Sequence, residues 1–222
     1  MADRPEFAAR KVRKRVDGVE VEDWFAEDFT LAELRTLRAR ETRPDVRPAS
    51  AAFDGRFGIP TFAEVVALAA SEGERLGRPI GVYPETKHPT FFLHEGRHLD
   101  GGPIAMDTSA MLVEVLVAAG FTDPARVFIQ SFELDNLLRL RRELMPRAGV
   151  ALPLVFLVGD VSGRSDATTT NFGQPYDVAW HARRGDDLAA RYGAVAAAVP
   201  GFGAATHYGE LKQFAFEHDH FQ

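Results

Sequence analysis

Residues 81–89 read Gly-Val-Tyr-Pro-Glu-Thr-Lys-His-Pro, so that an apolar run ends in a carboxylate and an ammonium two residues apart. In a β-strand, residues i and i+2 point to the same side of the sheet. Glu85 and Lys87 are therefore expected to face one space, in which a metal-bound oxyanion such as a phosphate could be held. The alternative is a surface ion pair at a strand end, because exposed carboxylates and ammoniums are common and couple weakly.

Outward from this segment, helical and strand patterns alternate along the chain. Thr30 followed by Glu33 has the spacing of a capping box, which predicts the start of the first helix. The predicted helices cover 31–40, 61–76, 107–120 and 133–144, and the predicted strands cover 79–83, 126–130 and 152–158. This alternation predicts a parallel sheet with right-handed crossovers.

The remaining segments have weaker signals. The cationic run 11–15 is expected to be a solvated arm, because acidic residues follow it. Residues 43–58 lack a sustained period and are expected to form a long surface loop, of the kind that often serves as a lid or binding loop. After a second long loop we expect a helix over 178–192, a short strand over 194–199 and a weak helix over 206–216.

Composition limits the classes of partner. A formal charge of −6 and a pI near 5.7 argue against nucleic acid or an anionic membrane as a bulk partner, although local basic patches remain possible. The absence of cysteine excludes disulfides, zinc-thiolate sites and cysteine nucleophiles. No apolar stretch is long enough for a membrane span, and residues 1–6 lack the pattern of a signal peptide, so a cytoplasmic location is expected.

Four motifs together resemble the glycerophosphodiester phosphodiesterases of the periplasmic bacterial type. Residues 84–89 are similar to the family's Pro-Glu-Ile-Lys-x-Pro stretch, with Thr86 in place of the usual Ile. Residues 27–34 (Glu-Asp-Phe-Thr-Leu-Ala-Glu-Leu), 59–64 (Ile-Pro-Thr-Phe-Ala-Glu) and 127–132 (Val-Phe-Ile-Gln-Ser-Phe) resemble its helix entries and its next strand. The resemblance runs from about residue 2 to about residue 203, in the family's order.

This resemblance implies an α/β fold, a partial TIM (β/α)8 barrel of the phospholipase C-like phosphodiesterase type. The full barrel needs about 250 residues. The family's His-Arg-Gly strand, Glu-x-Asp strand and His-Asp pair would precede Met1, and its last strand, with Asp-Gly-x-x-Thr-Asp, is also missing. We therefore expect one truncated domain over 1–222, with a helix and long loop in 1–58, barrel units in 59–203 and a tail in 204–222.

The resemblance also implies a reaction, the metal-dependent hydrolysis of a small glycerophosphodiester to glycerol 3-phosphate and an alcohol. By position, Glu85 corresponds to a ligand of a divalent metal, Ca²⁺ or Mg²⁺, and Lys87 to the lysine that offsets phosphate charge. Gln130 and Phe132 lie where the substrate would bind, although core packing is an equal alternative for them. The proton-transfer histidines belong to the missing strands, so a non-catalytic fragment or pseudoenzyme is the alternative. The oligomeric state is open, and relatives are often periplasmic or secreted.

A third function class comes from His94, Glu95 and His98, which satisfy the H-E-x-x-H pattern of zinc proteases. That chemistry needs both histidines on one helix face. Gly96 lies between them, Gly-Gly-Pro at 101–103 ends any helix, and Ile104 stands at the third ligand position. We expect that the two histidines do not share a helix and bind no zinc tightly.

Overall fold

The computed structural model describes residues 4–16, 19–158 and 202–206, together with the single positions 185, 187 and 190. The helices in this part are η1 (Pro5–Arg10), η2 (Ala26–Asp28), α1 (Leu31–Leu34), α2 (Pro48–Ala51), α3 (Phe62–Leu76), η3 (Phe91–Glu95), α4 (Thr108–Ala118), α5 (Leu134–Arg139), η4 (Leu140–Leu144) and α6 (Met145–Arg147). The strands are β1 (Val12–Val16), β2 (Val19–Asp23), β3 (Ile129–Ser131), β4 (Leu154–Val158) and β5 (Phe202–Thr206). No described helix is long and apolar enough to cross a membrane.

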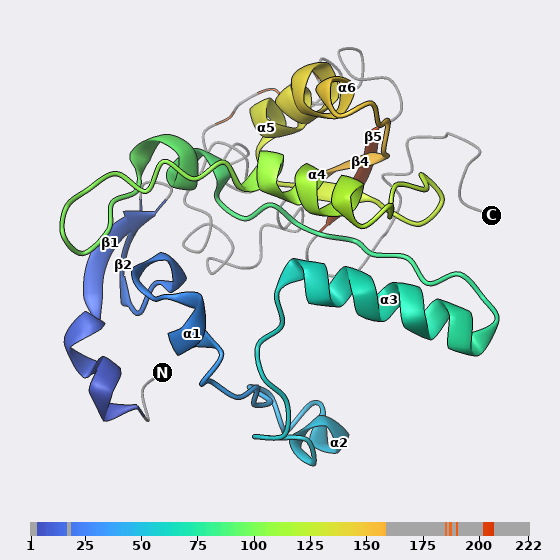
Figure 1. Ribbon diagram of the computed structural model, residues 1–222. Helices are drawn as coiled ribbons and strands as arrows, with labels where there is room; N and C mark the ends of the chain where they lie inside the picture. The colour runs from blue at the N-terminus through green and yellow to red at the C-terminus, as the bar shows by residue number, and fades with distance from the viewer. Residues whose placement is uncertain are drawn as a thin grey trace.

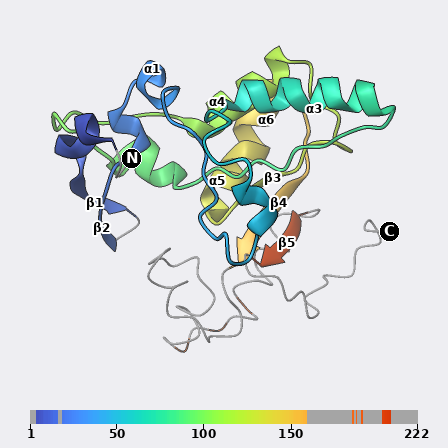
Figure 2. The same ribbon diagram turned by 90° about the horizontal axis from the view of Figure 1, so that it is seen from below.

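The described chain contains a parallel sheet, of which β4 and β5 are labelled in Figure 1 and all three strands in Figure 2. Its order is β3-β4-β5, with Gln130 opposite Val155 in the first pair of strands. The segment 80–86 lies on the other side of β3, joined by parallel bridges between Val82 and Val127 and between Glu85 and Gln130. The predicted parallel arrangement is therefore confirmed for β3, β4, β5 and the segment 80–86, whereas β1 and β2 form a separate antiparallel pair.

The two faces of this sheet differ. One face, formed by alternate residues such as Val82, Ile129 and Leu154, is covered by α3, α4 and the continuous α5–η4–α6 segment. The opposite face carries a smaller apolar cluster of Phe128, Phe132, Val155 and Leu157. Helices on one face only are what a barrel wall requires, and the described residues form an open wall rather than a closed barrel.

Capping chemistry fixes the ends of the longer helices as predicted. Thr61 accepts a hydrogen bond from the backbone N–H of Glu64, and the Glu64 carboxylate returns one to Thr61, which completes a capping box at the start of α3. Gly77 ends the helix in the left-handed region at φ 64°, which a residue without a Cβ adopts without strain. Asp107 caps α4 by accepting from the N–H of Ala110.

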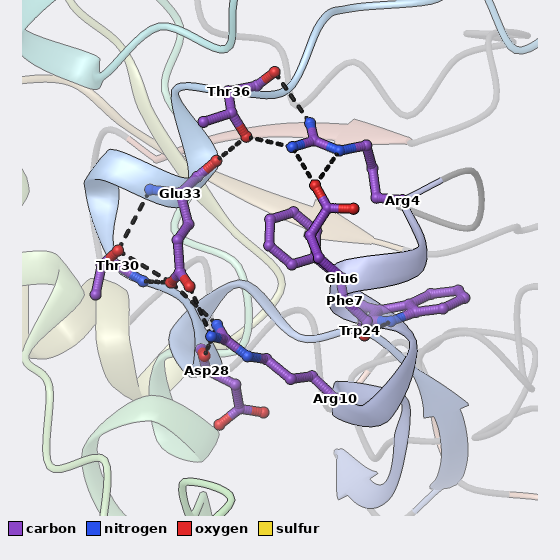
Figure 3. Close-up of polar contacts among 9 residues, drawn as sticks. All are labelled: Arg4, Glu6, Phe7, Arg10, Trp24, Asp28, Thr30, Glu33 and Thr36. Atoms are coloured by element: carbon purple, nitrogen blue, oxygen red, sulfur yellow. Dashed lines mark hydrogen bonds and ion pairs between the residues drawn. The ribbon is translucent and has the colours of Figure 1, made fainter.

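Residues 4–16 and 19–36 form a cluster beside the helices, shown in blue in Figure 1 and in detail in Figure 3. Arg10 donates to both carboxylate oxygens of Glu33 at 2.6 and 3.0 Å, and Glu33 completes the capping box with Thr30. The neighbouring guanidinium lowers the pKa of Glu33 to about 2. The Trp24 indole donates to the Phe7 carbonyl at 2.7 Å, so that β2 is tied to η1.

Four details differ from the sequence predictions. Residues 79–83 form no regular strand, and the segment pairs with its neighbour only through isolated bridges at Val82 and Glu85. The run 11–15 is not a solvated arm, because residues 12–16 form β1, whose basic side chains face the acidic strand β2; Arg13 lies 3.2 Å from Glu22. The helix predicted over 31–40 ends at Leu34, although its capping box is present. The helix predicted to stop before Pro146 instead continues through it to Arg147, as the η4 π-helix passes into α6.

Beyond β4 the structure describes few residues. The last described strand is β5, parallel to β4, with Ala204 opposite Phe156. The strand predicted over 194–199 lies outside the described residues, as do the helix predicted over 178–192, apart from single positions, and residues 207–216 of the final predicted helix.

Candidate functional site

The site is built at the carboxyl end of the segment 80–86. The Lys87 ammonium lies 2.8 Å from the Glu85 carboxylate, so the two side chains occupy one space as their spacing predicts. Glu85 is 15% exposed and Lys87 is 53% exposed. The carboxylate is thus held against the sheet, whereas the ammonium can move toward a ligand.

Gln130 stands beside this pair on the neighbouring strand. It is the bridge partner of Glu85, its N–H donates to the Pro84 carbonyl at 2.9 Å, and its side-chain amide donates to the Tyr83 carbonyl at 3.0 Å. The structure therefore brings Gln130 together with Glu85. Phe132 is buried farther along the same face, where it packs with Val155.

Tyr83 is a site residue that the sequence analysis missed. It lies two residues before Glu85, and its ring meets the Phe128 ring edge-on at 6.5 Å between centroids. Partial burial, and then the negative charge of Glu85, raise the pKa of the Tyr83 phenol, so the hydroxyl stays protonated and can donate. The same i, i+2 alternation that pairs Glu85 with Lys87 could have identified it.

A buried polar network lies behind the pair, on the helix-covered face of the sheet. Thr86 points away from its two charged neighbours, and its hydroxyl oxygen accepts from the Asn136 side-chain amide at 3.0 Å. The Asn136 oxygen accepts from the Ser109 hydroxyl at 2.6 Å, and the Ser131 hydroxyl donates to the Thr86 carbonyl at 3.3 Å. All four side chains are buried, so α4, α5 and β3 jointly fix the backbone between Glu85 and Lys87.

The loop that follows Lys87 is fixed in a similar way. The buried Glu133 carboxylate accepts from the backbone N–H of Thr90 at 3.1 Å and from the Thr90 hydroxyl. Glu133 lies two residues after the end of β3, so the end of this strand restrains the loop that follows the neighbouring segment 80–86. The sequence pattern places Glu133 only at the start of a helix, because a helical pattern does not reveal that a carboxylate is buried.

His94 and His98 do not share a helix, as predicted. His94 lies in η3, which ends at Glu95, and His98 belongs to a tight turn in which its N–H donates to the Gly102 carbonyl at 2.9 Å. The His98 ring lies 3.8 Å from the Asp28 carboxylate, in the N-terminal cluster. The zinc-protease arrangement is therefore absent from this described segment.

The candidate site offers a divalent metal one carboxylate ligand, that of Glu85. Among the described residues, no three His, Cys, Asp or Glu side chains lie close enough together to hold a metal ion. The described residues alone therefore do not complete a metal site, and further ligands would have to come from elsewhere.

Comparisons with known proteins agree on one family. Residues 10–183 match the sequence model of the glycerophosphoryl diester phosphodiesterase family. The chain is 29% identical over 182 residues to glycerophosphodiester phosphodiesterase GDPD6 of Arabidopsis thaliana, covering 78% of this chain and 44% of that protein. It is 30% identical over 155 residues to a glycerophosphodiester phosphodiesterase of Haemophilus influenzae, covering 66% of this chain and 39% of that protein.

Among solved structures, a putative glycerophosphoryl diester phosphodiesterase from Silicibacter pomeroyi aligns over 90% of this chain and 65% of its own, with a TM-score of 0.42 and 17% identity. The chain spans less than half the length of the curated relatives it matches.

Proposed function

The chain belongs to the glycerophosphoryl diester phosphodiesterase family, and from this premise we propose that it carries part of an active site that hydrolyses a glycerophosphodiester to glycerol 3-phosphate and an alcohol. The observation that supports this most directly is the Glu85–Lys87 pair, 2.8 Å apart at the carboxyl end of the segment 80–86, which pairs in parallel with β3. Barrel enzymes place their reacting groups at this end.

The two side chains would have different roles. Hydrolysis of a phosphodiester builds negative charge on the phosphoryl oxygens and on the leaving oxygen, and a positioned ammonium stabilises that charge. Lys87 is exposed enough to turn from Glu85 to a phosphate, whereas Glu85 is held by the sheet. Gln130, Phe132 and the protonated Tyr83 line the same face, and would contact the glycerol part of the substrate.

We propose a hard divalent cation, Ca²⁺ or Mg²⁺, as cofactor, with Glu85 as one of its ligands. Such a cation polarises a phosphate oxygen when it is bound, and carboxylate oxygens are its preferred protein ligands. Since the described residues offer no group of three ligands, the remaining carboxylates and the proton-transfer histidines would come from strands that precede the matched segment in the resembled family.

Because the described residues do not complete a metal site, we expect the chain taken alone to be inactive. We predict that the 222-residue chain hydrolyses glycerophosphocholine negligibly, because general acid and base groups each supply about two to four orders of magnitude in rate. Release of glycerol 3-phosphate, measured by a coupled dehydrogenase assay with added Ca²⁺ or Mg²⁺, checks this. Robust turnover by this chain, lost on substitution of a described histidine such as His88, would show that the catalytic groups are placed wrongly.

The proposed function is tested on the longest product of the reading frame that encodes this chain. Glu85→Gln should abolish metal-dependent release of glycerol 3-phosphate, and Lys87→Gln should lower kcat by about 10²-fold or more, the usual cost of one charge-stabilising donor. Glu114→Gln and Lys11→Gln, which change exposed residues away from the site, are matched controls. Full activity in Glu85→Gln would refute the assignment.

A further inference from the structure

Residues 39–57 form a closed loop that projects from the molecule. The N–H of Ala39 donates to the Phe57 carbonyl at 2.8 Å, the N–H of Gly55 donates to the Ala39 carbonyl at 3.0 Å, and the N–H of Glu41 donates to the Asp54 carboxylate at 2.7 Å. The loop carries α2, which lies apart from α3 and α4 in Figure 1 and comes toward the viewer in Figure 2. The 39–57 loop is therefore closed by hydrogen bonds between its two ends and is not an irregular connection.

The 39–57 loop and the residue just beyond it expose large apolar side chains. Val46, Phe53 and Phe57, with Ile59 just beyond the loop, are each between 45% and 59% exposed. The Phe53 and Phe57 rings lie 6.0 Å apart, and the Arg56 guanidinium lies 5.7 Å from the Phe53 ring centroid. Clustered aromatic rings in water are unfavourable unless another surface covers them.

The same region is cationic in an otherwise acidic chain. Residues 39–57 contain four arginines and three acidic residues, hence a net charge of +1, whereas the whole chain carries −6. Two of the three acids are engaged within the loop: the Glu41 carboxylate accepts from Arg47 and from the backbone N–H of Arg43, and Asp54 accepts from the N–H of Glu41. The four arginines of the loop are exposed.

The position of the loop relates this surface to the candidate site. The loop leads directly into α3, and after Gly77 the chain turns back as the segment 80–86. Because α3 and that segment run in opposite directions, the start of α3 lies toward the end of the sheet that carries Glu85 and Lys87. The 39–57 loop therefore joins α3 at the same end of the sheet as the site.

We propose that the 39–57 loop docks on an anionic lipid bilayer. Guanidinium groups bind lipid phosphates in bidentate fashion, and exposed phenylalanine rings insert at the boundary between headgroups and acyl chains. The acidic remainder of the chain is repelled by the same surface, so docking is oriented, with the loop toward the lipid. This binding requires no catalysis, so it can be tested and can fail independently of the proposed hydrolysis.

The test is co-sedimentation of the chain with vesicles of phosphatidylcholine alone or mixed with phosphatidylglycerol. We expect binding to the mixed vesicles only, and weaker binding as salt rises. Arg43→Glu with Arg56→Glu should weaken it at least tenfold, whereas the same charge change at Arg141 and Arg142, both exposed in η4, should change it less than twofold.

A second pair of variants tests the apolar part. Phe53→Ser with Phe57→Ser should weaken binding at least tenfold, and Leu68→Ser, at an exposed apolar residue of α3, should not. Circular dichroism of each variant shows whether misfolding causes its loss of vesicle binding. The salt dependence of binding by the unaltered chain tests the electrostatic part. Equal binding to phosphatidylcholine alone, no binding to either vesicle, equal loss in the controls, or loop variants that change the oligomeric state instead would each overturn the proposal; the last would assign the loop to contact between chains.

Discussion

Thr86→Val should destabilise the fold although it changes almost no volume. The Thr86 hydroxyl accepts a 3.0 Å hydrogen bond from the Asn136 amide, and both side chains are buried. Valine leaves that N–H donor without its partner and away from water, which costs about 1–3 kcal/mol. For a chain of this length the melting temperature should fall by on the order of 5 °C.

The assay is unfolding followed by circular dichroism, with Thr86→Ser as the control that keeps the hydroxyl. Replacing the hydrogen-bonding partners together, as Thr86→Val with Asn136→Leu and Ser109→Ala, should recover most of the loss, because no donor or acceptor of the network is then left unpaired. If Thr86→Val is as stable as the unaltered chain, or if the triple variant loses the sum of the single effects, the network does not stabilise the strand end as described.

Two further predictions concern the supporting structure. The Arg139 guanidinium holds the pKa of Asp107 below its usual value, so the stability that this carboxylate contributes is present above about pH 4 and is lost as pH falls through the lowered pKa; Asp107→Asn should flatten the acid side of a plot of melting temperature against pH. Gly96→Ala should cost about 1–3 kcal/mol, because the new Cβ would stand 2.5 Å from the Ile104 side chain. Gly58→Ala, which meets nothing nearer than 3.9 Å, is the control in urea unfolding, and equal effects at both glycines would contradict this steric explanation.

The elements that sequence predicted well are those with local signals. The capping residues Thr61 and Asp107 and the terminating Gly77 act within one turn of the backbone they satisfy, so their positions in the sequence define the ends of α3 and the start of α4. The pairing of Glu85 with Lys87 is equally local, because it needs only the two-residue period of a strand.

The features that sequence missed depend on contacts between distant segments. Residues 12–16 form a strand because residues 19–23 offer acidic partners across a hairpin, which a charge run alone does not reveal. Nothing in the helical pattern distinguishes Asn136 from any other polar residue. Its hydrogen bond forms only because Thr86, 50 residues earlier in the sequence, lies opposite it in the fold. Residues 43–58 were predicted as a loop, but the closure of the observed 39–57 loop depends on pairing between its two ends.

Side chains alternate between the two faces of the sheet at residues 85–87, so residues that bind a ligand and a residue that stabilises the fold lie next to one another. Glu85 and Lys87 face the open side of the sheet, so their substitution should alter ligand binding and charge stabilisation while changing stability little, since an exposed ion pair contributes about 0–1 kcal/mol. Thr86 faces the helices, where it has no contact with a ligand but fixes the backbone that carries both neighbours. A small loss of geometry at such a position can reduce a rate by about 10²-fold without removing any reacting group. Thr86→Val in the longest product of the reading frame should therefore lower kcat more than Thr86→Ser does, with both charged side chains still present.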